Sequence, residues 1–173
     1  MGGLIALIQN VGGTTVLVGA EAEAQAVFGN FSADAGLSLE KSKLGSVTVL
    51  DPNTGDPVSL GGRALPLAPP WTANVGAQYA FPLPNSATLT PRIDVSNTGG
   101  QWATPFQRFG EYLPERTLVN AQVAYVWQKW KATIYATNAF NQHYIIAVNV
   151  GVPDSLRYAG APQQFGIRVE RSF

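Results

Sequence analysis

The sequence of 173 residues contains no cysteine and a single histidine, His143. The absence of cysteine excludes disulfide frameworks, thiolate metal sites and cysteine nucleophiles. A metal site with His143 as its one imidazole would need carboxylates placed around it by the fold, and no motif in the sequence indicates them. A Ser/His/Asp arrangement and a phosphate-binding glycine loop before a helix are also missing. We therefore expect no metal, no cofactor and no enzymatic activity.

Charge of either sign is scarce. Lys and Arg number 11, Asp and Glu number 11, and together they make up 13% of the chain, about half of the roughly 25% that is usual in soluble domains. A net charge of zero provides no sequence-wide field that would attract nucleic acid. Nucleic acid is therefore not expected among the partners of this chain.

Long hydrophobic runs are also missing. The longest wholly apolar run near the start is Leu4 to Ile8, far short of the roughly 20 residues that a membrane-spanning helix needs. Only helices and closed barrels satisfy all of their backbone hydrogen bonds in hydrocarbon. If this chain belongs in a membrane, it must therefore cross it with β-strands.

Alternation of apolar and polar residues is the dominant pattern that the sequence does contain. From Thr14 to Phe28 the even positions are mostly apolar, while the odd positions include Glu21 and Glu23. A period of two predicts a strand with one apolar and one polar face. The pattern predicts about eight strands, near residues 4–9, 14–28, 31–40, 72–81, 87–95, 119–128, 130–137 and 164–173. Pro91 predicts a bulge or a poorly paired position within one of them.

The connections between these predicted strands alternate in length. Short links lie near residues 29–30, 82–85 and 128–129, and long links span roughly residues 45–70, 99–116 and 145–162. In an antiparallel meander every second turn lies at the same end, so the long loops should share one rim. Aromatic residues cluster beside the short links: Phe28, Phe31, Tyr79, Phe81, Tyr125, Trp127, Trp130 and Phe173. This combination favours an outer-membrane β-barrel with an aromatic girdle.

Two alternatives to a larger barrel remain open on the pattern alone. A self-contained eight-stranded barrel with a structural or adhesion role would pair residues 4–9 with residues 164–173. A soluble β-sandwich acting as a binding module would bury the apolar faces against each other. Against the sandwich, the apolar faces are rich in Ala and poor in Leu and Ile, and the loops are long for a compact domain.

Four segments carry a resemblance to a known family. These are NVGGTTVLVGAEAEA from Asn10, LPLAPPWTANVGAQYAF from Leu65, the set Asn138, Phe140, Asn141 and Tyr144, and GAPQQFGIRVERSF from Gly160 to the terminal Phe173. In this order they resemble the C-terminal part of a TonB-dependent outer-membrane receptor. Gln163 stands where that pattern usually has Arg, and Arg171 where it usually has an apolar residue.

The resemblance implies that residues 1–173 are the C-terminal segment of a plugged barrel of the roughly 22-stranded type, with the plug domain and the earlier strands absent. It implies a place in the bacterial outer membrane, contact with outer-membrane lipid, and coupling to TonB through the missing N-terminal part. The implied function is energy-coupled uptake of a scarce small molecule such as a siderophore, cobalamin or oligosaccharide. An assembly signal in the last strand would comprise Phe165, Gly166, Val169 and Phe173.

Two groups of residues are candidates for function. The first lies in the expected rim loops and combines aromatic rings with cations: Trp102, Phe106, Arg108, Phe109, Tyr112, Arg157 and Tyr158. Such residues could hold a ligand, or they could pack the loops against one another. The second consists of charges on the polar faces of the strands: Glu21, Glu23, Arg92, Asp94, Arg168 and Glu170. We expect Glu21 and Glu23 to form ion pairs in the barrel lumen, with Arg92, with Arg168 or with the absent plug.

Overall fold

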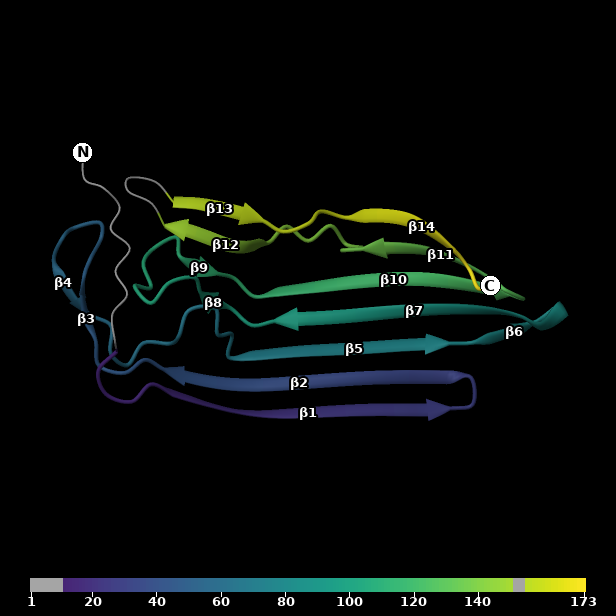
Figure 1. Cartoon of the computed structure of the whole chain (residues 1–173), viewed down its shortest axis with the longest axis horizontal. Coiled ribbons are helices and arrows are strands. Elements are labelled where there is room, and N and C mark those ends of the chain that lie inside the picture. Colours follow the sequence, from purple (N-terminus) through teal and green to yellow (C-terminus); the bar gives the residue numbers. More distant parts are fainter. Residues whose placement is uncertain (1–10, 151–154) are drawn as a thin grey trace.

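The computed structural model describes residues 11–150 and 155–173, and in this part the chain forms one large antiparallel sheet (Figure 1). The long strands follow one another in chain order across the sheet. They are β1 (Val16–Phe28), β2 (Phe31–Lys43), β5 (Trp71–Tyr79), β7 (Ala87–Thr98), β10 (Arg116–Trp127), β11 (Trp130–Thr137) and β14 (Gln164–Arg171). The predicted all-β antiparallel meander is therefore confirmed. The expected strand at residues 4–9 lies outside the described residues.

The pairing register keeps the alternating apolar positions of neighbouring strands on one face of the sheet. Ala35 of β2 pairs with Val75 of β5, and Val75 pairs in turn with Val95 of β7. Because side chains alternate along a strand, one register places the whole apolar set on the same side. Val75, Ile134 and Ile167 are nevertheless more than half exposed. The apolar face has no cover within the described part of the chain.

Each long loop contains a short hairpin, and all of these hairpins lie at the same end of the sheet (Figure 1). The hairpins are β3–β4 (Thr48–Leu50 and Pro57–Ser59), β8–β9 (Gln101–Trp102 and Tyr112–Leu113) and β12–β13 (Ile145–Val150 and Ser155–Ala159). The predicted grouping of the long loops at one rim is confirmed, whereas the small hairpins within them are not apparent from the alternation. Leu113 is the one fully buried large side chain among the described residues, and it belongs to this rim.

The link between β5 and β7 differs from the predicted short turn. It contains β6 (Phe81–Leu83), which also pairs with β7, and a 3-10 turn, η1 (Pro84–Ser86). Pro91 pairs with Val123 of β10 without a register shift, but the pairing of β7 on its other side stops at Arg92 and resumes at Leu89. Proline has no N–H to donate. The expected poorly paired position is confirmed on that side, and the expected bulge is absent.

No helix in the described ranges is long and apolar enough to cross a membrane.

Aromatic side chains surround the end of the sheet opposite the long loops. Phe28 pairs with Phe31 across the β1–β2 turn, and Trp127 pairs with Trp130 across the β10–β11 turn. The guanidinium of Arg171 lies 5.2 Å from the ring centroid of Trp130 and 5.3 Å from that of Phe173. All eight predicted girdle residues are exposed. The sheet therefore presents a band of solvent-accessible rings at its short-turn end.

Candidate functional site

The rim loop from Gly99 to Glu115 is organised around a buried carboxylate. Glu111 is 2% exposed, and its Oε2 accepts a hydrogen bond from Thr104 Oγ1 at 2.5 Å and one from the backbone N–H of Arg108 at 3.0 Å. Its backbone carbonyl accepts a further bond from the N–H of Ala103 at 2.9 Å. A buried carboxylate is costly unless it is paired in this way. Sequence reasoning missed Glu111, although a charged residue within an aromatic loop is a signal for such an anchor.

Arg108 connects this loop to the β3–β4 hairpin. Its Nη2 lies 2.5 Å from Oδ1 of Asp51, its Nη1 lies 3.6 Å from Oε1 of Glu111, and its guanidinium lies 4.3 Å from the ring centroid of Phe106. The side chain is only 21% exposed. Arg108, a candidate for ligand binding, is thus paired with carboxylates of its own chain. The contacts of Arg108 and Phe106 are those of the alternative, in which these residues pack the loops against one another.

The carboxylate of Asp51 is stabilised in its charged form. The backbone N–H of Asn53 donates a 2.7 Å hydrogen bond to Asp51 Oδ1, and this bond, followed by the hydrogen bond and charge of Arg108, holds the pKa of Asp51 below its ordinary value despite an opposing effect of burial. The ion pair between Asp51 and Arg108 is therefore intact throughout the neutral pH range. Sequence reasoning missed Asp51, which lies far from Arg108 along the chain.

Further hydrogen bonds join the other long loops to the same segment. Nη1 of Arg63 donates to the carbonyl of Pro105 at 3.2 Å and also to that of Phe106. Nη2 of Arg157, in β13, donates to the carbonyl of Gly110 at 2.8 Å. All three long loops are consequently connected through residues 105–111, which makes the rim one assembly in place of three independent loops.

The rings that remain accessible at this rim are a second, different group. The ring of Trp102 packs edge-on against that of Tyr112, with centroids 5.0 Å apart and planes at 62°. Phe109 is fully exposed, Tyr112 is 45% exposed and Tyr158 is 48% exposed. Among the predicted rim aromatics, Phe109, Tyr112 and Tyr158 have exposed surface for a ligand, whereas Trp102 is partly buried beside Tyr112, and Arg108 and Phe106 serve the loop.

On the polar face the guanidinium of Arg92 lies between an aspartate of its own strand, β7, and an aspartate of β2, across the intervening β5. Nη2 of Arg92 is 2.9 Å from Asp34 and 2.5 Å from Asp94, and its Nε donates to Asp94 at 2.8 Å. Gly76 separates the two aspartates in the register, and a Cβ at Gly76 would clash with Arg92 Nη2. The glycine thus provides the space in which the guanidinium lies. Sequence analysis identified Arg92 and Asp94 but missed Asp34 and Gly76.

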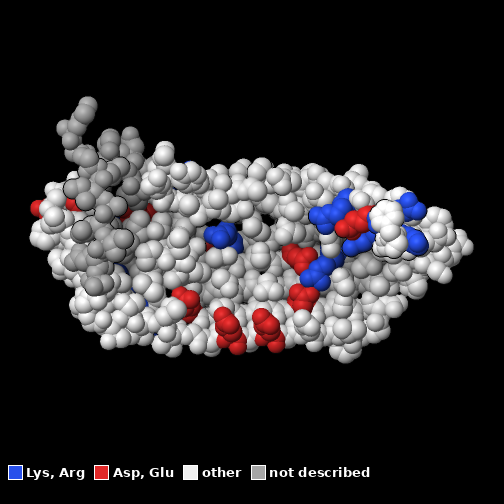
Figure 2. Space-filling view, in the orientation of Figure 1, with Lys and Arg blue, Asp and Glu red and all other residues white. Residues whose placement is uncertain are grey.

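The other polar-face charges do not join this cluster. Figure 2 shows acidic groups spaced along the β1 edge of the sheet, where β1 contains Glu21 and Glu23. Among the described residues neither glutamate forms an ion pair, and Glu21 accepts a long hydrogen bond of 3.4 Å from Ser38 Oγ. Their expected pairing with Arg92 or Arg168 is wrong here, because Arg92 is held by its aspartates. Arg168 lies 5.9 Å from the ring centroid of Tyr135.

The predicted charge Glu170 pairs with Lys131 of the neighbouring strand. The distance between Lys131 Nζ and Glu170 Oε2 is 3.6 Å, and both side chains are half exposed. An exposed pair of this kind contributes little to stability. Close by, the ring of Tyr135 covers Gly166, where an added Cβ would clash with the ring. Gly166, which the resemblance implies as part of an assembly signal, therefore also has a packing role in the sheet.

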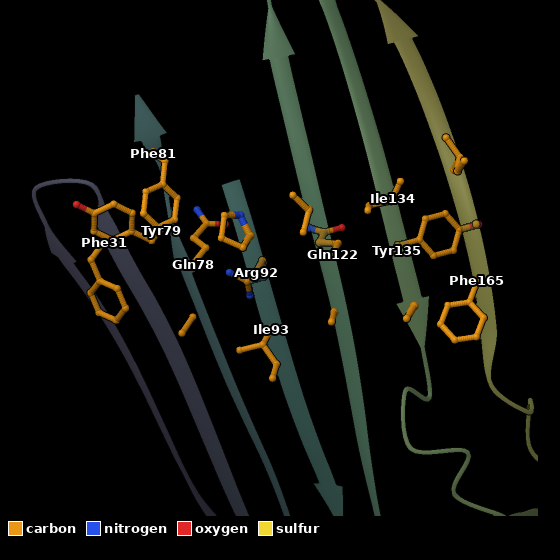
Figure 3. Close-up of a pocket in the computed structure, with 17 residues that line it drawn as sticks. Phe31, Gln78, Tyr79, Phe81, Arg92, Ile93, Gln122, Ile134, Tyr135 and Phe165 are labelled. Atoms are coloured by element: carbon orange, nitrogen blue, oxygen red, sulfur yellow. The ribbon is translucent and has the colours of Figure 1, made fainter. Parts of the chain in front are cut away.

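A groove of about 870 Å³ crosses the apolar face of the sheet (Figure 3). Its floor includes Ala77, Ala121 and Ala136, and its walls include Phe31, Tyr79, Phe81, Phe165 and Ile167. Small side chains between large ones leave this hollow, which the sequence analysis did not predict. Although Gln78, Arg92 and Gln122 also line it, most of its surface is apolar, so the groove suits hydrocarbon chains better than a polar ligand.

Comparisons with known proteins agree with this geometry. The chain is similar in structure to the ferric yersiniabactin uptake receptor FyuA from Yersinia pestis, with 16% identity and a TM-score of 0.78 over 92% of this chain and 24% of that one. It is also similar to the siderophore receptor PiuA from Acinetobacter baumannii, with 14% identity and a TM-score of 0.70 over 90% of this chain and 21% of that one. The chain thus spans about a quarter or less of the length of either structure.

No curated protein sequence matches the chain. A family model described as TonB dependent receptor-like, beta-barrel, matches residues 2–141. These residues include β1 to β11, that is, most of the sheet and two of the three long rim loops. The chain therefore belongs to the TonB-dependent receptor-like β-barrel family.

Proposed function

We propose that this chain is the C-terminal segment of an outer-membrane receptor that takes up a scarce small molecule, with siderophores as the favoured ligand class. Family membership supports the receptor role, and the printed functions of FyuA and PiuA, a ferric yersiniabactin uptake receptor and a siderophore receptor, support the ligand class. The proposal has no enzymatic step. Uptake is driven through TonB by a plug domain that lies outside residues 1–173.

The uncovered apolar face is the observation that carries the membrane location. Leu39, Val75 and Ile134 are each about half exposed or more, and they lie on the face opposite Asp34 and Arg92. In water such a continuous apolar surface would favour aggregation. In a bilayer it is the lipid-facing side of a barrel wall, and the polar face lines the lumen.

The rim would provide the first contact with the ligand. The rings of Trp102, Phe109, Tyr112 and Tyr158 combine apolar surface with hydroxyl and indole groups, a composition that binds flat or aromatic small molecules well. They are carried by loops that Arg108, Arg63 and Arg157 tie together. A connected rim holds these rings in place before the ligand arrives, which lowers the entropy cost of binding.

The test uses the full-length receptor that contains this segment, produced in a Gram-negative host lacking its own siderophore receptors. Binding and uptake of radioactive iron are measured with a panel of ferric siderophores, with cobalamin and oligosaccharides as other ligand classes. Replacement of Tyr112 by Ala should weaken ligand binding about tenfold. The matched control is Tyr125→Ala, because Tyr125 is 42% exposed, like Tyr112 at 45%, but lies at the short-turn end.

Two outcomes would contradict the proposal. If the receptor is recovered from the soluble fraction, folded and monomeric without detergent, the membrane location is wrong. If it is in the outer membrane but uptake of every tested ligand is unchanged when the receptor is deleted, the transport role is wrong. Equal effects of the Tyr112 and Tyr125 replacements would remove the rim from ligand binding while leaving the receptor role intact.

A further inference from the structure

We propose that Lys41 and Lys43 form a binding site for the phosphate of an anionic lipid in the outer leaflet of the membrane. The site rests on the proposed membrane location and concerns the outside of the barrel wall. It is separate from the rim, where a transported ligand would bind.

Both lysines lie on the apolar face of the sheet. Side chains alternate along β2, so Lys41 and Lys43 share the side of Leu37 and Leu39, while Ser38 and Glu40 lie on the other. The pairing with β1 places Val18 opposite Lys41 and Val16 opposite Lys43. Val16, Val18, Leu37 and Leu39 are all exposed. The two ammonium groups thus extend from a surface that is otherwise hydrocarbon.

The position of Lys41 along β2 matches the outer boundary of the bilayer. Phe31, at the short-turn girdle, and Lys41 are ten residues apart in β2. At a rise of about 3.3 Å per residue and a strand tilt of about 40°, this corresponds to roughly 25 Å across the membrane, the approximate height of the apolar band of such barrels. Lys41 therefore lies at the opposite interface from the girdle.

An aromatic residue marks the same boundary on the next strand. Trp71 pairs with Leu39, two residues before Lys41, and begins β5. Tryptophan at the end of a membrane-facing strand is typical of the headgroup region. Lys43, one repeat farther, extends beyond Trp71 into the headgroup layer, where long cationic side chains direct their charge.

The charges of these lysines are free to bind an anion. Among the described residues neither Lys41 nor Lys43 forms an ion pair, whereas Lys131 is paired with Glu170. Glu40, although adjacent in sequence, is on the opposite face. The end of the Lys43 stem lies near Gly62 of the rim, where an added Cβ would be 3.7 Å from Lys43 Cε. Both lysines are therefore available to an external acceptor.

A lipid phosphate is the acceptor that fits this arrangement. Lysine ammonium groups bind phosphate as compact point charges, and side chains two residues apart on a strand are roughly 7 Å apart at their base, close enough for both to reach one phosphate group. Acyl chains attached to that phosphate would extend toward the girdle over Leu39, Leu37 and Val18. The surface thus complements both parts of an anionic lipid, which a free phosphate ion would not require.

The experiment measures lipid retention by the full-length receptor in nanodiscs. The receptor is reconstituted in phosphatidylcholine with or without phosphatidylglycerol, and the lipids that stay bound after transfer to detergent are counted by native mass spectrometry. The test variant is K41Q/K43Q, and the matched control is K129Q/K131Q, which removes two charges at the short-turn end. We expect the wild-type receptor and the control to retain phosphatidylglycerol preferentially, and the test variant to lose this preference about tenfold.

Four results would overturn the site. The first is an unchanged preference in K41Q/K43Q, and the second is an equal loss in the control, which would indicate a general effect of net charge. The third is displacement of the lipid by inorganic phosphate alone at millimolar concentration, which would indicate a site for the free ion. The fourth is failure of the wild-type receptor to insert into either bilayer, which would overturn the membrane location together with this site. If the receptor does insert and K41Q/K43Q keeps the wild-type lipid preference, only the site is overturned.

Discussion

Arg108 of the central rim loop and Asp51 of the β3–β4 hairpin form an ion pair, with Nη2 and Oδ1 2.5 Å apart. The two residues belong to loops that follow different strands, β2 and β7, and β5 separates these strands in the sheet. Their ion pair therefore connects loops on the two sides of β5. The ion pair makes the positions of Phe109 and Tyr112, on one loop, dependent on a carboxylate of another.

Replacement of Arg108 by Gln should loosen this rim. The change leaves Glu111 buried without its cation and Asp51 without its partner, and removing one member of a partly buried pair costs more than the pair contributes. We expect faster hydrogen exchange in residues 99–115 and 48–59 with unchanged exchange in β7 and β10. Exchange measured by mass spectrometry checks this. The control K131Q breaks the exposed pair with Glu170 and should leave the rim unchanged; equal exchange in R108Q and wild type would contradict the prediction.

The rim should open at acidic pH because the pKa of Asp51 is lowered in the folded chain. A carboxyl group with a lowered folded pKa contributes stability that is fully present above its unfolded pKa, 3.8 for a model aspartate, and that is lost as the pH falls through the folded value. Arg108 and Glu111 face the same pair. Proteolysis of the rim should therefore be constant at neutral pH and increase below about pH 4. In Asp51→Asn the rim should already be open at neutral pH, and a wild-type transition near neutral pH would argue against this ion pair.

Replacement of Gly76 by Ala should destabilise the sheet by roughly 1–3 kcal/mol, the usual range for insertion of a methyl group into a filled site. The added Cβ would meet the guanidinium of Arg92 and displace it from Asp34 and Asp94. Urea unfolding of the detergent-folded receptor measures the effect. In an Arg92→Ala background the same Gly76→Ala change should cost markedly less. If the two changes are additive, the contact with Arg92 is not the cause.

Asn138 should be among the most sensitive positions outside the strands. It is 5% exposed, its Nδ2 donates to the carbonyls of Gln142 and Ala161 at 2.9 and 3.0 Å, and its Oδ1 accepts from the N–H of Gln142 at 2.8 Å. Its φ of 48° is also in the left-handed region, which Ala disfavours. Replacement by Ala should cost about 3 kcal/mol or more, since several buried groups lose partners.

Asn138→Gly separates the two causes. Glycine tolerates the backbone conformation but loses the hydrogen bonds, so it should recover roughly 1 kcal/mol relative to Ala. The difference is obtained from the denaturant concentrations at the unfolding midpoints of the two variants, provided that the free energy of unfolding depends equally on denaturant in both. Full recovery in the Gly variant would show that backbone conformation alone requires Asn at this position.

How much of the structure could be predicted from the sequence depends on how far apart along the chain the interacting residues lie. The faces of β1 and β2 could be predicted because Glu21, Glu23 and their apolar neighbours alternate within one strand, and alternation is a local property. The partners of Arg92 could be predicted only in part. Asp94 is two residues away on the same face, whereas Asp34 becomes a neighbour only through the register of two intervening pairings.

The candidate site was predicted less well than the fold for the same reason. Phe109, Tyr112 and Tyr158 could be named as candidates from their loops and their chemistry, because exposed rings need no particular partner. The sequence leaves open whether Arg108 binds a ligand or packs the loops, since its partners, Asp51 and Glu111, are identified only by the way the loops fold together. The apolar groove depends on side-chain sizes on seven strands at once, a combination that no single segment displays.

The near absence of buried side chains has a consequence for how this chain responds to mutation. Leu113, at the rim, is the one large residue of the described chain that is wholly enclosed, so the apolar face of the sheet has no packed interior whose volume must be conserved. At the proposed membrane location the sheet is a boundary between two media, and each position on its apolar face is constrained mainly by the medium that it meets. A change of size at Val75 or Ile134 should therefore be tolerated, whereas a change of polarity there, or a one-residue insertion that exchanges the two faces of a strand, should not.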